Sequence, residues 1–493
     1  MKKTLKMLLI FAIVCVFAIL IPNEVAAVSI STEADLRKAI EVDNEAEITL
    51  DADIEVTGTT GLTTRETGFT LKNDIVINGN GHKISSSTIR TLFDVFAYEG
   101  DDADNAATPV TITFNNVKLV STDANARCID TRTGKVTLNL NSVIMDATGC
   151  VSGNAQTLTI GGKYPISKIN TINVTSSTLL AGKNGYGIIV YNPVNLNVTS
   201  SDIDGYSALY MKSTVDINGP TNAEGASGSK VVIDNSVLSS KNDSLYESNV
   251  FGTIVLEDTG VTLKIKNSEV IAGGEGLGQV AIAESIEVES TKGNSVEVSD
   301  STIIANTAEE LVEINNDNTS VTFNVGVSSN VEIPENLLPA GTKLEKDENG
   351  NNVIVPVKYK VTVKEATNGK VVANVTEAAE GTTVELDITP DEGYVLDAVV
   401  VEGLAQETIV ENNKFTMPAN DVTVSATFKA EPVDEDKDDT VTPPIGEGTE
   451  GSKEEVKDEA KDESPKTGAK SLVIFFVVAA VLGLAISKKE RGF

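Results

Sequence analysis

A short phrase of alternating apolar and polar residues, closed by Asn, Ser or Asp, recurs along the chain from residue 30 to about residue 334. Strict alternation is the pattern of a β-strand with one buried face. The copies follow one another at intervals of roughly 24 to 35 residues, a period typical of solenoids. They begin and end at residues 110–116, 136–142, 171–177, 195–201, 231–236, 263–268 and 296–301.

Each repeat contains two more short strands. A corner of Asn, Ser or Asp follows the phrase, and these residues tolerate left-handed backbone. A second strand comes next, as at residues 118–121 or 143–145, and then a third apolar patch. Three strands per repeat with little helical periodicity predict an all-β chain, with a right-handed parallel β-helix over residues 28–335. The third patches lie at residues 128–129, 150–151, 187–190, 208–211, 253–256, 280–283 and 311–314.

The start of this region predicts a cap. Residues 31–40 have the pattern of an amphipathic helix with Ser31 or Thr32 as N-cap and acidic residues in the first turn. Such a helix would cover the open end of the first coil. The strings at residues 48–56 and 75–84 resemble the opening coils of pectate-lyase-like (pectin-lyase-like) β-helix proteins, and this resemblance implies the fold rather than an activity.

A second module is expected at residues 358–430. Alternating strands are predicted at residues 359–363, 371–375, 383–388, 395–401 and 422–428. The strings Pro-Asp-Glu-Gly-Tyr at 390–394 and Met-Pro-Ala-Asn-Asp at 417–421 resemble the bacterial surface repeat modules related to the internalin B-repeat. In that family these strings form turns and core, so the resemblance implies a spacer without active residues.

The N-terminus predicts export. Two lysines precede an apolar run at residues 7–21, and small residues lead up to Ala27. This is the layout of a secretory signal peptide over residues 1–27, cleaved between Ala27 and Val28.

The composition limits the partners. Lys and Arg number 39 against 72 Asp and Glu, a net charge of -33. An anionic partner would be repelled, so we expect no nucleic acid and no anionic lipid. We expect no cofactor, although the acidic charge makes calcium a possible ligand. Residues 431–463, rich in acids, Lys and Pro, predict a disordered acidic linker.

The C-terminus, residues 464–493, has three parts in order: a short peptide, an apolar segment at residues 472–486, and a cationic end at 488–491. The apolar segment is short for a transmembrane helix, and the cations after it would stay cytoplasmic. The peptide resembles the Leu-Pro-x-Thr-Gly sorting signal of Gram-positive surface proteins, in the Ser-Pro-Lys-Thr-Gly form of some clostridial class B sortases. It consists of Ser464, Pro465, Lys466, Thr467 and Gly468.

The resemblance implies the fate of the chain. A sortase cysteine would attack the Thr467 carbonyl, cleave before Gly468 and transfer the chain to peptidoglycan. Sortase and peptidoglycan are therefore the expected partners, and the expected location is the extracellular cell wall. A membrane-tethered protein that carries the peptide by coincidence is the alternative.

No catalytic constellation emerges. The nearest cluster is Arg127, Asp130 and Arg132, with Asp202 and Asp204 two repeats later, and stacking is not expected to join them in one site. The single histidine, His82, is expected in a turn rather than at a metal. An acidic string at residues 101–105 lacks the spacing of an EF-hand, so a solvated insertion is favoured over a calcium loop.

The two cysteines that remain after signal cleavage, Cys128 and Cys150, are expected at matching positions of consecutive third strands. Such positions would lie about 4.8 Å apart, which permits a disulfide. A reduced buried pair is favoured over a bonded one, because Cys is an ordinary small core residue.

These features favour a wall-anchored adhesin whose β-helix binds a host matrix protein or glycan. A polysaccharide-active β-helix enzyme, lyase or hydrolase, and a passive wall component are the alternatives. Few aromatic residues weigh against a carbohydrate-active site.

Overall fold

The computed structural model describes residues 27–57, 67–95, 109–123, 125–131, 135–150, 155–161, 169–182, 185–212, 225–240, 251–273, 279–284, 292–404 and 412–432. The chain divides into two compact units, Met1–Glu431 and Pro432–Phe493. The predicted signal segment before Ala27, the linker after residue 432, the acidic string at 101–105 and the sorting signal lie outside the described residues. None of the helices in the described ranges has the length and apolar character that crossing a bilayer requires.

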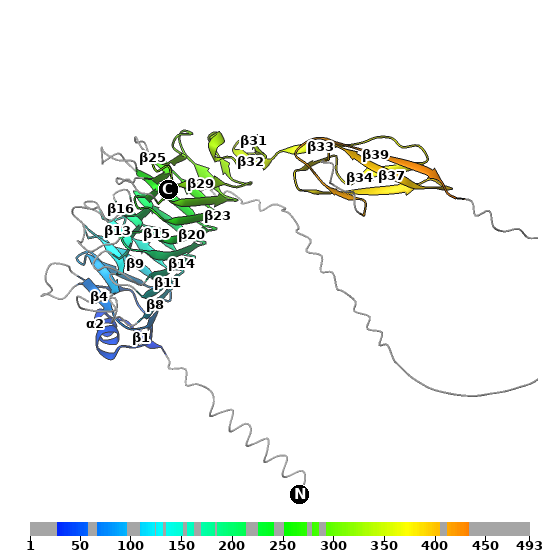
Figure 1. The fold of residues 1–493 in the computed structure, drawn as a ribbon. Coiled ribbons are helices and arrows are strands. Elements are labelled where there is room, and N and C mark those ends of the chain that lie inside the picture. Colours follow the sequence, from blue (N-terminus) through cyan, green and yellow to red (C-terminus); the bar gives the residue numbers. More distant parts are fainter. Residues whose placement is uncertain are drawn as a thin grey trace, which may run out of the picture. The chain divides into compact units, whose positions relative to one another are not determined.

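The repeats form a right-handed parallel β-helix with three sheets along its length (Figure 1). The first sheet contains the repeating phrase. Its strands, in spatial order, are β1 (Val28–Ile30), β2 (Glu47–Leu50), β5 (Ile75–Asn78), β8 (Val110–Asn115), β11 (Val136–Asn141), β14 (Asn170–Thr175), β17 (Val194–Thr199), β20 (Lys230–Asp234), β23 (Thr262–Lys266), β26 (Ser295–Ser299) and β29 (Ser320–Phe323).

The second sheet follows the corner after each phrase. Its strands are β3 (Ile54–Glu55), β6 (Lys83–Ser86), β9 (Lys118–Ser121), β12 (Ile144–Asp146), β15 (Thr178–Leu180), β18 (Asp202–Gly205), β21 (Val237–Ser240), β24 (Glu269–Ile271), β27 (Thr302–Ile304) and β30 (Ser328–Ser329), with β32 (Asn352–Pro356) and β31 (Thr342–Lys346) added at the end.

The third sheet completes each coil. Its strands are β4 (Thr67–Leu71), β7 (Thr91–Val95), β10 (Arg127–Thr131), β13 (Ala155–Ile160), β16 (Gly185–Val190), β19 (Ser207–Met211), β22 (Phe251–Leu256), β25 (Gln279–Glu284) and β28 (Val312–Glu313). Up to β30, the described strands of neighbouring coils pair in parallel and in register, for example Leu138 with Ile172 and Leu158 with Ile188. The inward side chains of all three sheets form one continuous apolar core.

The corner between the first and second sheets explains the Asn, Ser or Asp that closes each phrase. At this corner φ lies between 45° and 55°, the left-handed region that most side chains avoid. Short polar side chains tolerate it best, because they bond locally. The corner residues are Asn80, Asn116, Ser142, Ser176, Ser200, Asn235, Asn267 and Asp300.

A buried serine follows the corner in the later coils and links one coil to the next. The hydroxyl of Ser236 donates to the Asp234 carbonyl at 2.8 Å and accepts the backbone N–H of Ser201 at 3.1 Å. The same arrangement joins Ser236 to Ser268, and Ser268 to Ser301. The ladder satisfies buried backbone donors at a bend where sheet hydrogen bonds are interrupted.

The predicted N-terminal helix is present. It consists of α2 (Glu33–Lys38) and a π-helical turn, η1 (Ala39–Asp43). Thr32 is the N-cap, and its hydroxyl accepts the N–H of Asp35 at 3.1 Å. Leu36 and Ile40 are buried in the β-helix core, so the helix closes that end of the apolar interior.

The β-helix continues beyond residue 335. After a short 3-10 turn, η2 (Glu335–Leu337), strands β31 and β32 form an antiparallel hairpin. β32 pairs with β30, where Ser328 lies opposite Val353. Ile354 is fully buried in the same core, so residues 342–356 complete the C-terminal end of the β-helix.

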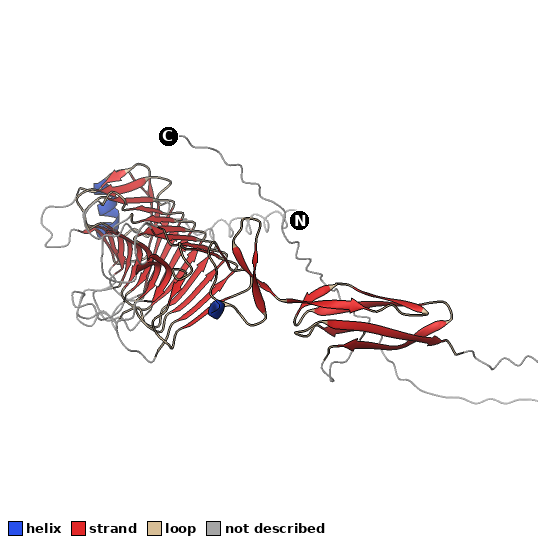
Figure 2. Ribbon diagram, turned by 90° about the horizontal axis from the view of Figure 1, so that it is seen from above, coloured by secondary structure: helices blue, strands red, loops and turns tan. Residues whose placement is uncertain are grey.

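The second module has its own core. Its strands form a four-stranded sheet, β35-β33-β39-β37, and a three-stranded sheet, β34-β36-β38. All five predicted strands of this module are present. The bounds are β33 (Lys358–Val363), β34 (Gly369–Ala373), β35 (Glu377–Ala379), β36 (Thr383–Pro390), β37 (Tyr394–Glu402), β38 (Lys414–Thr416) and β39 (Val422–Ala430), and Figure 2 shows them as strands.

One third strand is not where the sequence predicts it. The patch at residues 150–151 was expected to be a strand, but β13 begins at Ala155. Cys128 therefore lies opposite Thr157, between the pairs Arg127–Gln156 and Ile129–Leu158, and not opposite Cys150. Cys128 is in the main core and Cys150 in a small alanine-rich cluster, and no disulfide joins these two described residues. Burial raises the pKa of the Cys128 thiol to about 12.

Candidate functional site

The charged residues that the sequence singles out separate into two places. Arg127 and Asp130 lie on β10 of the third sheet, where the guanidinium contacts the carboxylate at 2.7 Å. Asp202 and Asp204 lie on β18 of the second sheet. The expectation that stacking does not unite them is confirmed for these four residues. Arg132 lies outside the described residues.

The outward row of the third sheet gathers more polar groups around this ion pair. Asp130 lies beside Asp94 of β7 and Thr159 of β13. The Thr159 hydroxyl donates to Gln156 at 2.6 Å. The Asp130 side chain is only 2% exposed and that of Arg127 14%. Each of these two contacts lies within a single strand, and the two charges are bonded to each other and largely shielded from solvent.

Further along the same outward face, four tyrosines gather. The rings of Tyr186 and Tyr210 are 5.1 Å apart, and those of Tyr186 and Tyr206 meet edge to face at 6.2 Å. Tyr191 packs against the same cluster, which also contains two buried aliphatic residues, Ile189 and Val255. No sequence motif predicts this cluster, because its members are spread over consecutive coils.

An ion pair borders the tyrosines. Lys212 contacts Glu257 at 3.2 Å, and its ammonium lies 5.3 Å from the centre of the Tyr210 ring. Burial raises the pKa of Tyr210 well above its ordinary value, and the nearby Glu257 carboxylate raises it further. The phenol therefore stays protonated at neutral pH, as a hydrogen-bond partner of Glu257 and not as a base.

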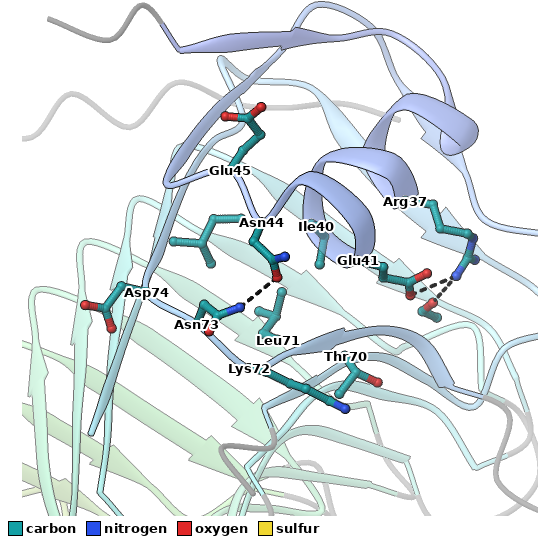
Figure 3. Close-up of a pocket in the computed structure, with 12 residues that line it drawn as sticks. Arg37, Ile40, Glu41, Asn44, Glu45, Thr70, Leu71, Lys72, Asn73 and Asp74 are labelled. Carbon is teal, nitrogen blue, oxygen red and sulfur yellow. Dashed lines mark hydrogen bonds and ion pairs between the residues drawn. The ribbon is translucent and has the colours of Figure 1, made fainter. Parts of the chain in front are cut away.

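A pocket of about 460 Å³ lies between the N-terminal helix and β4 (Figure 3). Ile40, Leu71 and Ile75 supply its apolar lining. Two hydrogen bonds connect the helix side to the strand side: Arg37 donates to the Gly68 carbonyl at 2.9 Å, and Asn73 donates to the Asn44 side-chain oxygen at 2.7 Å. These contacts attach the cap to the edge strand of the third sheet, so the pocket belongs to the capping structure.

His82 is in a turn, as predicted. It follows Asn80 and Gly81, both with positive φ, and its Nδ1 lies 3.3 Å from the Asp53 carboxylate. Within the described ranges no group of three or more His, Cys, Asp or Glu side chains could hold a metal ion. The expectation of no cofactor, with calcium as a ligand that the charge would suit, stays a prediction.

Residues 359–432 match the family described as the Divergent InlB B-repeat domain. This agrees with the resemblance of residues 358–430 to bacterial surface repeat modules, and it indicates a surface-associated protein.

The chain is also similar to a solved structure from L. reuteri, titled "L. reuteri 53608 SRRP", at 16% sequence identity, with a TM-score of 0.30. The similarity covers 62% of this chain and 96% of that one. No curated protein matches the chain. What the comparisons identify is therefore one part of the chain, the module similar to the divergent InlB B-repeat domain.

Proposed function

We propose that this protein is a cell-wall-anchored adhesin whose β-helix binds an extracellular ligand. The observation that carries the proposal is the match of residues 359–432 to a surface repeat domain, placed in the sequence between the β-helix and the predicted sorting signal. In this order the β-helix is the folded part farthest along the chain from the attachment site. A display role for the β-helix follows.

The N-terminal boundary fits export. Val28 is the first residue of β1 and pairs with Ile48 of β2. Cleavage of a signal peptide between Ala27 and Val28 would leave this strand complete, so the mature chain would keep its first coil.

Anchoring is tested at Thr467. Replacing Thr467 by Ala keeps the backbone carbonyl that the sortase would attack but removes the threonine side chain that belongs to the motif. The variant is expected to lose most of its covalent linkage to peptidoglycan, measured by boiling purified walls in detergent and detecting protein released only by muralytic digestion. Lys466→Ala, at the variable position of the motif, is the control and should remain linked. Detergent-resistant attachment of the Thr467 variant would refute sortase anchoring.

Adhesion is tested with residues 28–431, most of the compact unit that ends at Glu431. We expect saturable binding to at least one component of an array of matrix proteins and glycans, and none by residues 358–431 alone. A blank array would favour the passive wall component.

The enzymatic alternative is measured on the same preparation. Arg127 and Asp130 are bonded to each other and shielded, so we propose that the β-helix is not an enzyme. Incubation with polygalacturonate, with and without calcium, should release no shorter chains. Sustained product release would overturn the non-enzymatic proposal.

A further inference from the structure

The outward side of the first sheet contains a regular surface that no charged residue interrupts. Four adjacent strands, β8, β11, β14 and β17, each contribute three outward side chains that are partly or fully exposed and alternate with buried ones. All twelve are threonine or asparagine. We call this surface the Thr/Asn face; it consists of Thr111, Thr113, Asn115, Thr137, Asn139, Asn141, Thr171, Asn173, Thr175, Asn195, Asn197 and Thr199.

The asparagines of this face are held by one another. Asn197 donates to Asn173 at 2.9 Å, Asn173 donates to Asn139 at 2.9 Å, and Asn139 donates to the Thr113 hydroxyl at 3.2 Å. A second ladder runs beside it, in which Asn141 donates to Asn115 at 2.9 Å. Side chains tied in this way have lost much of their rotamer freedom before any ligand arrives.

The ladders leave capacity for a ligand. An Asn amide offers two N–H donors and a carbonyl oxygen with two lone pairs. A member in the middle of a ladder, such as Asn173, uses one donor and one lone pair on its neighbours, so it keeps one of each for a partner above the sheet. The threonines add a hydroxyl and a methyl group. The spacing is fixed by the fold: about 4.8 Å between coils and about 6.6 Å between alternate residues of one strand.

The Thr/Asn face is uncharged, although the chain as a whole has a net charge of -33. The four corner residues beside it are also uncharged and exposed: Asn116, Ser142, Ser176 and Ser200. On the next strand, β20, charge returns with Lys230 and Asp234. A neutral, flat and periodic surface is complementary to a neutral and periodic ligand, whereas an ionic partner would find no counter-charge there.

From this we infer that the Thr/Asn face binds a neutral polysaccharide, whose rows of hydroxyl groups pair with the amides and hydroxyls of successive coils. Sugar hydroxyls both donate and accept hydrogen bonds, as the free positions of the ladders require. This inference rests on the proposed adhesin function and names its surface and ligand class. It needs no aromatic platform, since many weak polar contacts on a rigid surface add up along a polymer.

The test uses one row of the sheet, in which Thr171 of β14 and Thr262 of β23 occupy equivalent outward positions. Lys230 occupies the same row in β20, so the fold accepts lysine there. Thr171→Lys places a long charged side chain in the middle of the face, and Thr262→Lys places it outside. Residues 28–431 with either change are titrated with a soluble neutral β-glucan, a soluble mannan and polygalacturonate, and folding is checked by circular dichroism.

We expect the unmodified protein to bind a neutral polysaccharide, Thr171→Lys to weaken that binding by about tenfold or more, and Thr262→Lys to leave it unchanged. Equal binding by both variants would overturn the assignment of the surface. Binding only to polygalacturonate or to a matrix protein would overturn the ligand class while the adhesin proposal stands. If the protein binds none of these polysaccharides and no component of the array of matrix proteins and glycans, both proposals fail.

Discussion

Replacing Glu284 by Ala is expected to lower the free energy of unfolding of the β-helix by about 3–5 kcal/mol. Glu284 is the last residue of β25, and its side chain is fully buried. One carboxylate oxygen accepts from Asn294 at 2.7 Å and from the Thr319 hydroxyl at 2.5 Å. The other accepts the backbone N–H groups of Asn315 at 3.1 Å and Asn316 at 2.9 Å.

The size of this effect follows from the donors that remain. Alanine would leave two backbone and two side-chain donors without their acceptor inside the protein. Asn294 is buried, and an unsatisfied buried group costs about 1–3 kcal/mol, whereas Asn316 and Thr319 are partly buried and Asn315 is exposed. The segment from 292 to 319 would lose the group that joins it to β25. Urea denaturation followed by circular dichroism measures the change, and limited proteolysis should locate new cleavage in this segment.

Two variants make the Glu284 prediction specific. Glu284→Gln keeps the shape but turns an N–H group toward the donors, so we expect an intermediate loss of about 1–2 kcal/mol. Glu297→Ala removes a carboxylate that is 45% exposed and paired with Lys264, and little change in the free energy of unfolding is expected, because solvent screens this pair. If Glu284→Ala were no more destabilising than Glu297→Ala, the carboxylate would not be a structural centre of the last coils.

The first sheet and its corner were predictable because their rules are local. Each phrase alternates strictly, and a residue that tolerates left-handed backbone ends it, as at Asn116 or Ser142. The N-cap at Thr32 and the five strands of the second module are local signals of the same kind. These features depend on residues that are close to one another in the sequence, so the elements appear in the structure where they were expected.

The third sheet was harder to predict, because both of its faces are buried. β13 reads Ala-Gln-Thr-Leu-Thr-Ile, and all six residues are buried, including the polar ones. Burial of polar residues hides the alternation that marks a strand with a solvated face. Residues 150–151 were therefore predicted as the strand instead, and for that reason the expectation that Cys128 and Cys150 occupy matching positions of consecutive strands was wrong.

The candidate surfaces depend on contacts between coils. Tyr186 and Tyr210 meet because they lie on paired strands of adjacent coils, β16 and β19. Glu284 finds its partners ten to 35 residues later in the chain. The Thr/Asn face was visible in the sequence as a polar half of each phrase, but its register and its amide ladders were not. A register set by the whole stack cannot be read from one repeat.

Replacing Phe93 by Ala should be the most damaging change in the N-terminal coils, with an expected loss of about 3–5 kcal/mol in the free energy of unfolding. Phe93 of β7 stacks on Phe69 of β4 with ring centres 5.3 Å apart. It also meets Phe114 of β8 edge to face at 5.0 Å. All three rings are fully buried, and the row crosses the core from the third sheet to the first.

The Phe93 substitution removes more than apolar area. Ring pairs in offset or edge-to-face geometry add about 0.5–1.5 kcal/mol beyond their burial, and Phe93 takes part in both pairs. Alanine would also leave a cavity between the sheets that the parallel strands cannot close without breaking their register. We expect the midpoint of urea unfolding to fall, measured by circular dichroism on residues 28–431.

A second buried phenylalanine distinguishes the contribution of ring contacts to stability from the contribution of burial alone. Phe323 of β29 is also fully buried, but no ring contact to it occurs among the described residues. Phe323→Ala should therefore cost less than Phe93→Ala, and Phe93→Leu, which fills most of the space, should cost less than either. Equal losses for the two alanine variants would show that burial alone accounts for the effect. Because the two positions lie near opposite ends of the β-helix, proteolysis should then report which end opens first in each variant.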